Sequence, residues 1–99
     1  MLFAFSVAPS VSDESGSVSA AVADAVRVVR DSGLPYELTS MFTTIEGEWD
    51  EVMPVIKAAC DAVAQHGPRV SLVLKADLRP GYEGQLSAKV DRVREQLGD

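Results

Sequence analysis

The sequence predicts an α+β fold of the ferredoxin-like type: a βαββαβ sandwich with a four-stranded antiparallel sheet and an added C-terminal helix. Two segments with a helical hydrophobic period, 18–29 and 52–63, each follow a segment with strand character. A third observation is the hairpin expected between them, within residues 36–48. This order is that of the split βαβ motif, and right-handed crossovers place both helices on one face of the sheet.

The first half of the chain supplies one strand and one helix. Residues 2–7 form an apolar run that ends before Pro9 and predicts a buried strand. Ser17 is the expected N-cap of the following helix, and Gly33 is its expected stop. The apolar stripe of this helix consists of Val18, Val22, Ala25 and Val29.

The second half begins with two short strands, expected at 36–39 and 43–48. Asp50 is the expected N-cap of the second helix, and Pro54 is tolerated there if it lies in the first turn. Residues 69–77 alternate in polarity, as a half-buried strand does. The stripe of the second helix is Val52, Ile56, Ala59 and Val63, and that of the C-terminal helix is Leu86, Val90, Val93 and Leu97.

Length and composition limit the classes of function. A chain of 99 residues is expected to form a single domain over residues 1–99. The net charge of −6 disfavours a nucleic acid as partner. The single cysteine rules out a disulfide within the chain. No apolar run is long enough to span a membrane, and the N-terminus lacks the features of a signal peptide, so we expect a cytoplasmic protein with no membrane partner.

Side-chain alternation predicts what each face of the sheet carries. Phe3, Phe5 and Val7 would face the helices with Tyr36 and the other apolar strand residues. The opposite, open face would mix small, apolar and polar side chains, namely Leu2, Ala4, Ser6, Glu37, Thr39, Thr44, Glu46, Ser71, Val73 and Lys75. Such a face fits three interpretations: a solvated surface, a subunit interface, or a surface for a flat ligand.

The stretch SGLPYELTSMFTTIEGE, residues 32–48, resembles the thiamine-binding protein family of the MTH1187/YkoF type (DUF77-like). Members typically carry a motif close to SGL-x-YELTPM-x-T-x-IEGE, and here Ser40 stands where proline is usual. The resemblance covers nearly the whole chain. It implies a small ferredoxin-like domain that assembles into a homodimer or homotetramer. Some members of the family bind thiamine or its hydroxymethylpyrimidine portion.

The predicted function is therefore non-catalytic binding of thiamine or a related hydroxymethylpyrimidine compound, with no other cofactor. Hydroxyls and carboxylates satisfy the polar edge of the pyrimidine, and a carboxylate suits the thiazolium cation. The alternative is a protein-interaction or oligomerisation module with no small ligand. The candidate ligand-binding residues are Ser6, Glu37, Thr39, Met41, Thr44 and Glu46.

Other chemical signals favour structural roles. His66 is the only histidine, so a histidine-based triad or metal cluster is not expected. His66 itself suits the C-terminal end of the second helix. Cys60 is expected in or near the core, and Trp49 is expected to act as a hydrophobic staple before the second helix. Catalytic and metal-binding residues are predicted to be absent.

Overall fold

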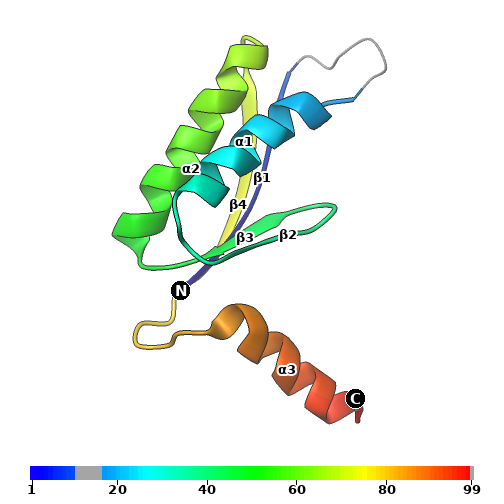
Figure 1. Ribbon diagram of the computed structural model, residues 1–99, viewed down its shortest axis with the longest axis vertical. Coiled ribbons are helices and arrows are strands. Elements are labelled where there is room, and N and C mark those ends of the chain that lie inside the picture. Colours follow the sequence, from blue (N-terminus) through cyan, green and yellow to red (C-terminus); the bar gives the residue numbers. More distant parts are fainter. Residues whose placement is uncertain (11–16, 99) are drawn as a thin grey trace.

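The computed structural model describes residues 1–10 and 17–98. Eight elements follow one another in these residues, and the sheet order is β2-β3-β1-β4 with all neighbours antiparallel. This confirms the predicted ferredoxin-like α+β fold, with its two long strands β1 and β4 side by side (Figure 1). The elements are β1 Leu2–Pro9, α1 Ser19–Asp31, β2 Tyr36–Leu38, β3 Thr43–Glu46, α2 Trp49–Val63, the 3-10 turn η1 Ala64–His66, β4 Val70–Asp77 and α3 Gln85–Leu97.

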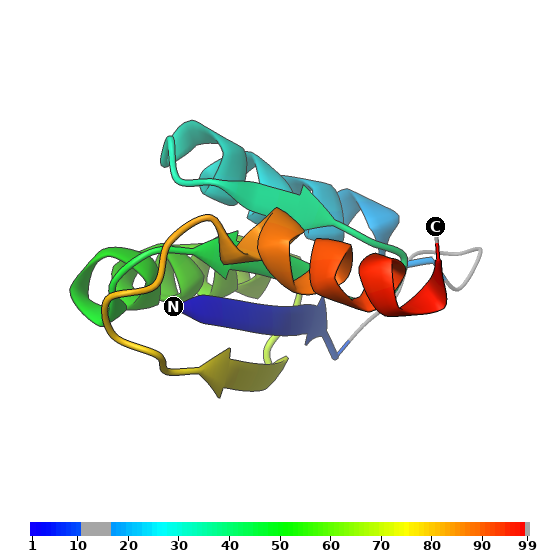
Figure 2. The same cartoon turned by 90° about the horizontal axis from the view of Figure 1, so that it is seen from below.

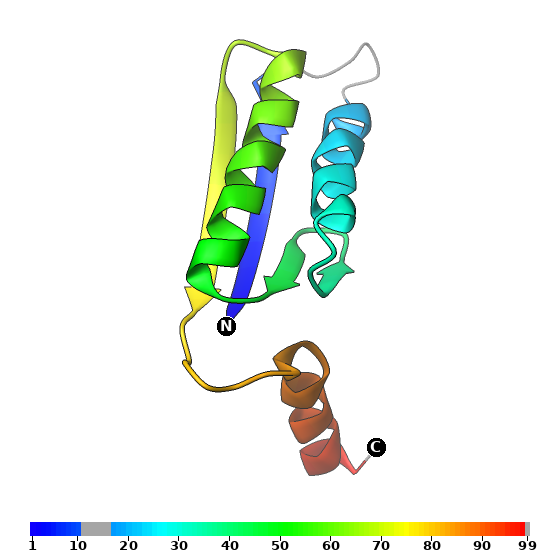
Figure 3. The same cartoon turned by 60° about the vertical axis from the view of Figure 1, so that its left-hand side comes forward.

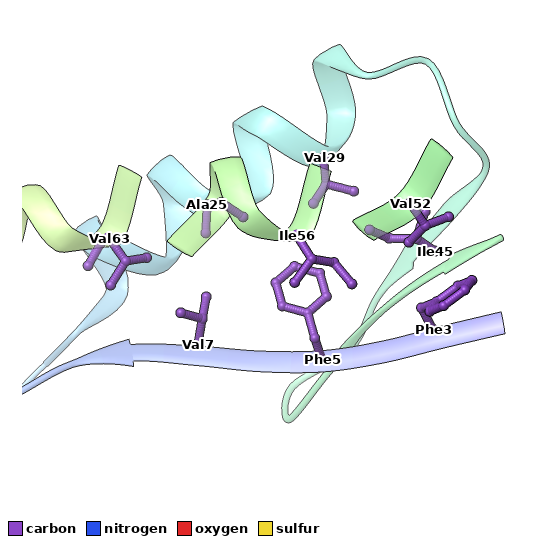
Figure 4. Packing of buried hydrophobic residues seen from close by; sticks show 11 residues of the cluster. Phe3, Phe5, Val7, Ala25, Val29, Ile45, Val52, Ile56 and Val63 are labelled. Carbon is purple, nitrogen blue, oxygen red and sulfur yellow. The ribbon is translucent and has the colours of Figure 1, made fainter. Parts of the chain in front are cut away.

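Helices α1 and α2 lie side by side over the same face of the sheet, as right-handed crossovers require (Figure 3). Between them and the sheet lies a core of apolar side chains (Figure 4). Phe3, Phe5 and Val7 are its contribution from β1, which confirms the predicted alternation of that strand. The other buried apolar residues are Ala21, Ala25, Val29, Ile45, Val52, Ile56, Ala59 and Val63.

Local capping differs from the prediction at both helix starts. The N-cap of α1 is Val18, although the hydroxyl of Ser17 still accepts from the backbone N–H of Ser19 at 3.1 Å. The N-cap of α2 is Glu48 and not Asp50, because the carboxylate of Glu51 reaches back to the N–H of Glu48 at 3.0 Å. Helix α1 ends as predicted, with Gly33 in the left-handed region at φ 78°.

Two consequences follow from the earlier start of α2. Pro54 lies in the second turn rather than the first, so it removes a helical amide that would bond the carbonyl of Asp50. Trp49 becomes the first helical residue instead of a residue that precedes the helix. Its ring still packs edge-on against Phe3, with 6.0 Å between ring centroids, while nearly half of the side chain is exposed. The helix start is therefore anchored to the core at β1.

Helix α3 lies beyond the end of the sheet and points away from the two-layer body (Figures 1 and 3). Seen from that end, it passes across the strand ends (Figure 2). None of its described residues is buried, and its main contacts are with β3. Two contacts fix its first half: the backbone N–H of Gln85 donates to Glu46, and the ammonium of Lys89 pairs with Asp77.

Candidate functional site

The strand register confirms that polar residues share the open face of the sheet. Glu37 lies opposite Thr44, which lies opposite Ala4, which lies opposite Lys75. Paired residues of antiparallel strands share a face, so these four side chains form one row across all four strands. Glu37 and Thr44 are therefore neighbours at the β2 side of this row.

Glu46 belongs to the same face but lies at the end of the sheet, in a row with Leu2 and Asp77. Its side chain is buried, with 9% exposed. One carboxylate oxygen accepts from the backbone N–H of Gln85 at 2.8 Å, which places a negative charge at the start of α3. The carboxylate predicted to meet a ligand thus also holds a helix in place.

A cavity of about 260 Å³ opens between α1 and the turn of the β2–β3 hairpin; we call it the hairpin groove. It is lined by residues 5–8 of β1, residues 38–43 of the hairpin, the N-cap Val18, and apolar residues of α1 that include Val22 and Val26. The described residues of this lining contribute hydroxyl and apolar groups and no ionisable side chain. The groove suits a flat, uncharged ring.

The hydroxyl of Thr39 is engaged within the hairpin turn. It donates to the carbonyl of Phe42 at 2.7 Å and accepts from the N–H of Phe42 at 3.3 Å. The backbone N–H of Thr39 also donates to that carbonyl, at 2.9 Å. These bonds close the turn and end β2 at Leu38, one residue before the predicted end.

A second cavity, of about 530 Å³, lies where the starts of α2 and α3 meet; we call it the acidic cavity. Four carboxylates line it, together with Tyr82, Met1 and Leu34. The four are Glu46, Glu48, Glu51 and Glu83. Two helix N-termini contribute roughly +0.5 charge each, so the cavity remains negative overall. Part of this charge stabilises the helix starts, because Glu46 and Glu51 each accept a hydrogen bond from a backbone N–H there.

The structure divides the six predicted ligand-binding residues into three groups. Ser6, Thr39 and Met41 line the hairpin groove, and Glu46 lines the acidic cavity. Glu37 and Thr44 adjoin each other on the open face. Ser6 lies four residues along β1 from Leu2, the partner of Glu46, so about 13 Å separates Ser6 from Glu46 along the strand. One ring cannot contact both.

Sequence reasoning missed the walls and backbone of the hairpin groove. Val22 was expected only as part of the apolar stripe of α1, yet it lines the groove together with Val26. Val7 also lines the groove, and no side-chain pattern can reveal what its backbone groups offer there. Gln85 was missed as the partner of Glu46 for the same reason.

The residues assigned structural roles keep them. Nε2 of His66 lies 2.6 Å from a carboxylate oxygen of Asp24 and ties the end of α2 to α1. This hydrogen bond lowers the pKa of the Asp24 carboxyl. Cys60 is half-buried against the core, and this burial raises the pKa of its thiol. The described residues contain no cluster of three or more His, Cys, Asp or Glu side chains that could hold a metal ion.

No helix within residues 1–10 and 17–98 has the length and apolarity required to cross a membrane.

Comparison with known proteins identifies relatives over nearly the entire chain. UPF0045 protein Mb1933 of Mycobacterium bovis is 49% identical over 99 residues, covering 98% of this chain and 94% of the relative. A UPF0045 protein of Methanothermobacter thermautotrophicus is 40% identical over 85 residues, covering 84% and 86%.

Solved structures agree with the fold. The hypothetical protein MJ1052 of Methanocaldococcus jannaschii superposes with a TM-score of 0.83 at 30% identity, covering 95% of both chains. A Thermotoga maritima protein provisionally assigned to thiamine biosynthesis or salvage gives a TM-score of 0.76 at 26% identity, covering 92% of this chain and 97% of that one. The family model described as "Thiamine-binding protein" matches residues 3–94. The chain therefore belongs to the thiamine-binding protein family.

Proposed function

We propose that this protein binds thiamine or a related hydroxymethylpyrimidine compound without catalysing a reaction on it. The observation that carries this proposal is the match of the thiamine-binding family model to residues 3–94. The relation to the Thermotoga maritima protein gives further support. Ligand binding of this kind requires a cavity of suitable size and polarity, and two cavities of the chain are candidates.

The hairpin groove is the better candidate for the uncharged pyrimidine ring. Its apolar walls favour a flat ring, and three of the predicted ligand-binding residues, Ser6, Thr39 and Met41, line it. In the acidic cavity, Glu46 and Glu51 already accept hydrogen bonds from the starts of α3 and α2. A ligand there would share these two carboxylates with the helix starts. Contacts of the ligand with Glu37, Thr44 and Glu46 stay predictions.

Isothermal titration with thiamine and with hydroxymethylpyrimidine tests the proposal, and hydroxyethylthiazole serves as the control for the other half of thiamine. Binding should also raise the free energy of unfolding by about 2.7 kcal/mol at ~100 times the dissociation constant. If none of these compounds binds, the chain is better described as an interaction module.

A further inference from the structure

The peptide of Val7 lies on a part of β1 that has a strand neighbour on one side only. Strand β4 pairs with β1 along its whole length, from Leu2 to Pro9. Strand β3 pairs only with Leu2 to Phe5. From Ser6 onward, no strand formed by the described residues pairs with the β3 side of this central strand, and the hairpin groove lies beside this edge.

The direction of the Val7 peptide follows from the hydrogen-bond alternation of an antiparallel ladder. On the β3 side, the N–H of Gly47 donates to the carbonyl of Met1 at 3.0 Å. On the β4 side, the N–H of Ser10 donates to the carbonyl of Arg69 at 2.9 Å. Odd-numbered residues of β1 therefore direct both N–H and C=O toward β3. Val7 is the next odd residue after the last pair, so both its groups face the groove.

No other backbone group within residues 1–10 and 17–98 is paired with the Val7 peptide on this side. The hairpin turn could have supplied one, but Thr39 and Phe42 use their groups on each other. Val7 as a residue is only 6% exposed. Buried peptide groups are nearly always paired with protein, water or ligand. The Val7 N–H and C=O are therefore an adjacent donor and acceptor in the groove that a ligand can pair with.

We infer that the hairpin groove is the subsite for the aminopyrimidine ring, with the Val7 peptide reading the polar edge of that ring. The Val7 N–H donates to a ring nitrogen, and the Val7 carbonyl accepts from the exocyclic amine. The inference rests on the proposed function and specifies which half of the ligand enters, and where.

Size and charge support the pyrimidine half. The cavity of about 260 Å³ is small for a two-ring ligand, since pockets for drug-sized molecules start at roughly 300 Å³. None of the described residues that line the groove is ionisable, so among them the thiazolium cation would lose its hydration without a counter-charge. The neutral ring enters the groove, and the cationic ring stays at the mouth.

A peptide strand fits this edge less well than a ring does. Strand addition needs a series of free N–H and C=O groups. Beyond Phe5 the edge offers only Val7 with both groups, because the next odd residue is Pro9, which has no N–H. A single donor–acceptor pair suits the edge of one heterocycle.

The first experiment follows the Val7 amide by ¹⁵N NMR during titration with hydroxymethylpyrimidine. The expected result is a downfield shift of the Val7 amide proton and exchange with solvent at least 10-fold slower. The Phe3 amide is the internal control, because β3 pairs with this residue and Phe3 does not line the groove. Calorimetric binding with an unchanged Val7 amide would overturn the inference and leave the proposed function standing. No binding of any thiamine-related compound would overturn both.

The second experiment fills the groove. Val22→Phe adds bulk from α1 into the groove and should weaken hydroxymethylpyrimidine binding at least 10-fold. Ala23→Phe is the matched control, since Ala23 lies next to it on α1 outside this lining. A pyrimidine without the exocyclic amine should bind the unmodified protein at least 10-fold more weakly. Equal affinity for that analogue would contradict the role of the Val7 carbonyl. Should Val22→Phe fail to fold, the analogue and the NMR titration decide the question.

Discussion

The carboxylate of Glu46 and the backbone amide of Gln85, 39 residues apart in the chain, are joined by a hydrogen bond of 2.8 Å. Through this bond a strand residue of the hairpin motif holds the start of the C-terminal helix. The side chain is buried at the end of the sheet, so solvent competes little for it.

Glu46→Gln separates the anchoring role of Glu46 from the predicted ligand role. The amide oxygen can still accept from Gln85, but the charge is lost. Charged hydrogen bonds contribute about 1.5–3 kcal/mol and neutral ones about 0.5–1.5, so the free energy of unfolding should fall by about 1 kcal/mol in urea denaturation. If the ligand lies in the hairpin groove, thiamine affinity should change less than 2-fold.

The control is Asp61→Asn, which removes the same charge from the exposed surface of α2. A drop in thiamine affinity of 10-fold or more in Glu46→Gln alone would place the cation of the ligand at Glu46 instead.

The pair between Asp77 and Lys89 makes the attachment of α3 sensitive to acid. The hydrogen bond from Lys89 lowers the pKa of the Asp77 carboxyl below its usual 3.8. The contribution of the pair is complete above that usual pKa and is lost as the pH falls through the lowered one. The side-chain NMR signals of Lys89 should therefore be constant at neutral pH and change only in acid below the usual pKa of Asp77. Asp77→Asn should abolish this transition, and a transition that persists in that variant would assign it to another group.

Gly47 is required by packing where β3 passes into α2. A Cβ atom at this position would lie 2.9 Å from Cγ2 of Val52, a fully buried side chain of α2. Gly47→Ala should therefore lower the free energy of unfolding by about 1–3 kcal/mol, as overpacking does. The double variant Gly47→Ala, Val52→Ala should lose less free energy of unfolding than the sum of the losses in the two single variants. Strict additivity in urea denaturation would show that the two side chains do not clash.

The apolar stripe of α3 predicts self-association into a homodimer or homotetramer. Val93 is 59% exposed and Leu97 is 69% exposed on α3, and Val73 is 56% exposed on the open face. Burial of such surfaces between copies favours closed oligomers. Light scattering at micromolar concentration should give a dimer or tetramer mass, and Val93→Glu should reduce it. Gln96→Glu, which adds the same charge beside the stripe, should not. A monomeric mass for the unmodified protein would refute this prediction.

The strand faces were predictable because alternation is a local property of the sequence. Phe3, Phe5 and Val7 are buried as expected, and Glu37 and Thr44 share the open face. The start of α2 was placed two residues late, because Asp50 is the better N-cap by type while the actual cap depends on the reach of Glu51 to the Glu48 amide. The free-energy difference between alternative N-caps is about 1 kcal/mol, so residue type alone does not decide which one is used.

The separation of the candidate site residues was not predictable for a different reason. The hairpin groove exists because β3 begins at Thr43, opposite Phe5, and so leaves the last four residues of β1 without a β3 partner; the Thr39 turn sets where β3 begins. The partner of Glu46 is a backbone amide, which carries no residue signature. Side-chain chemistry could therefore identify Ser6, Thr39 and Glu46 as candidates. It could not show that Ser6 and Thr39 line one cavity and Glu46 another.

The buried alanines of the helix layer have a consequence for the groove. Ala21 and Ala25 of α1 and Ala59 of α2 are almost completely buried, and small side chains allow helices to approach closely. Ala25 also lines the hairpin groove, whose other wall is the β2–β3 turn. Because α1 packs against α2, the position of this groove wall depends on how closely the two helices approach. Ala59 does not line the groove, yet a larger residue there would push α1 and so change ligand affinity. Selection on ligand size can therefore act through core positions remote from the ligand.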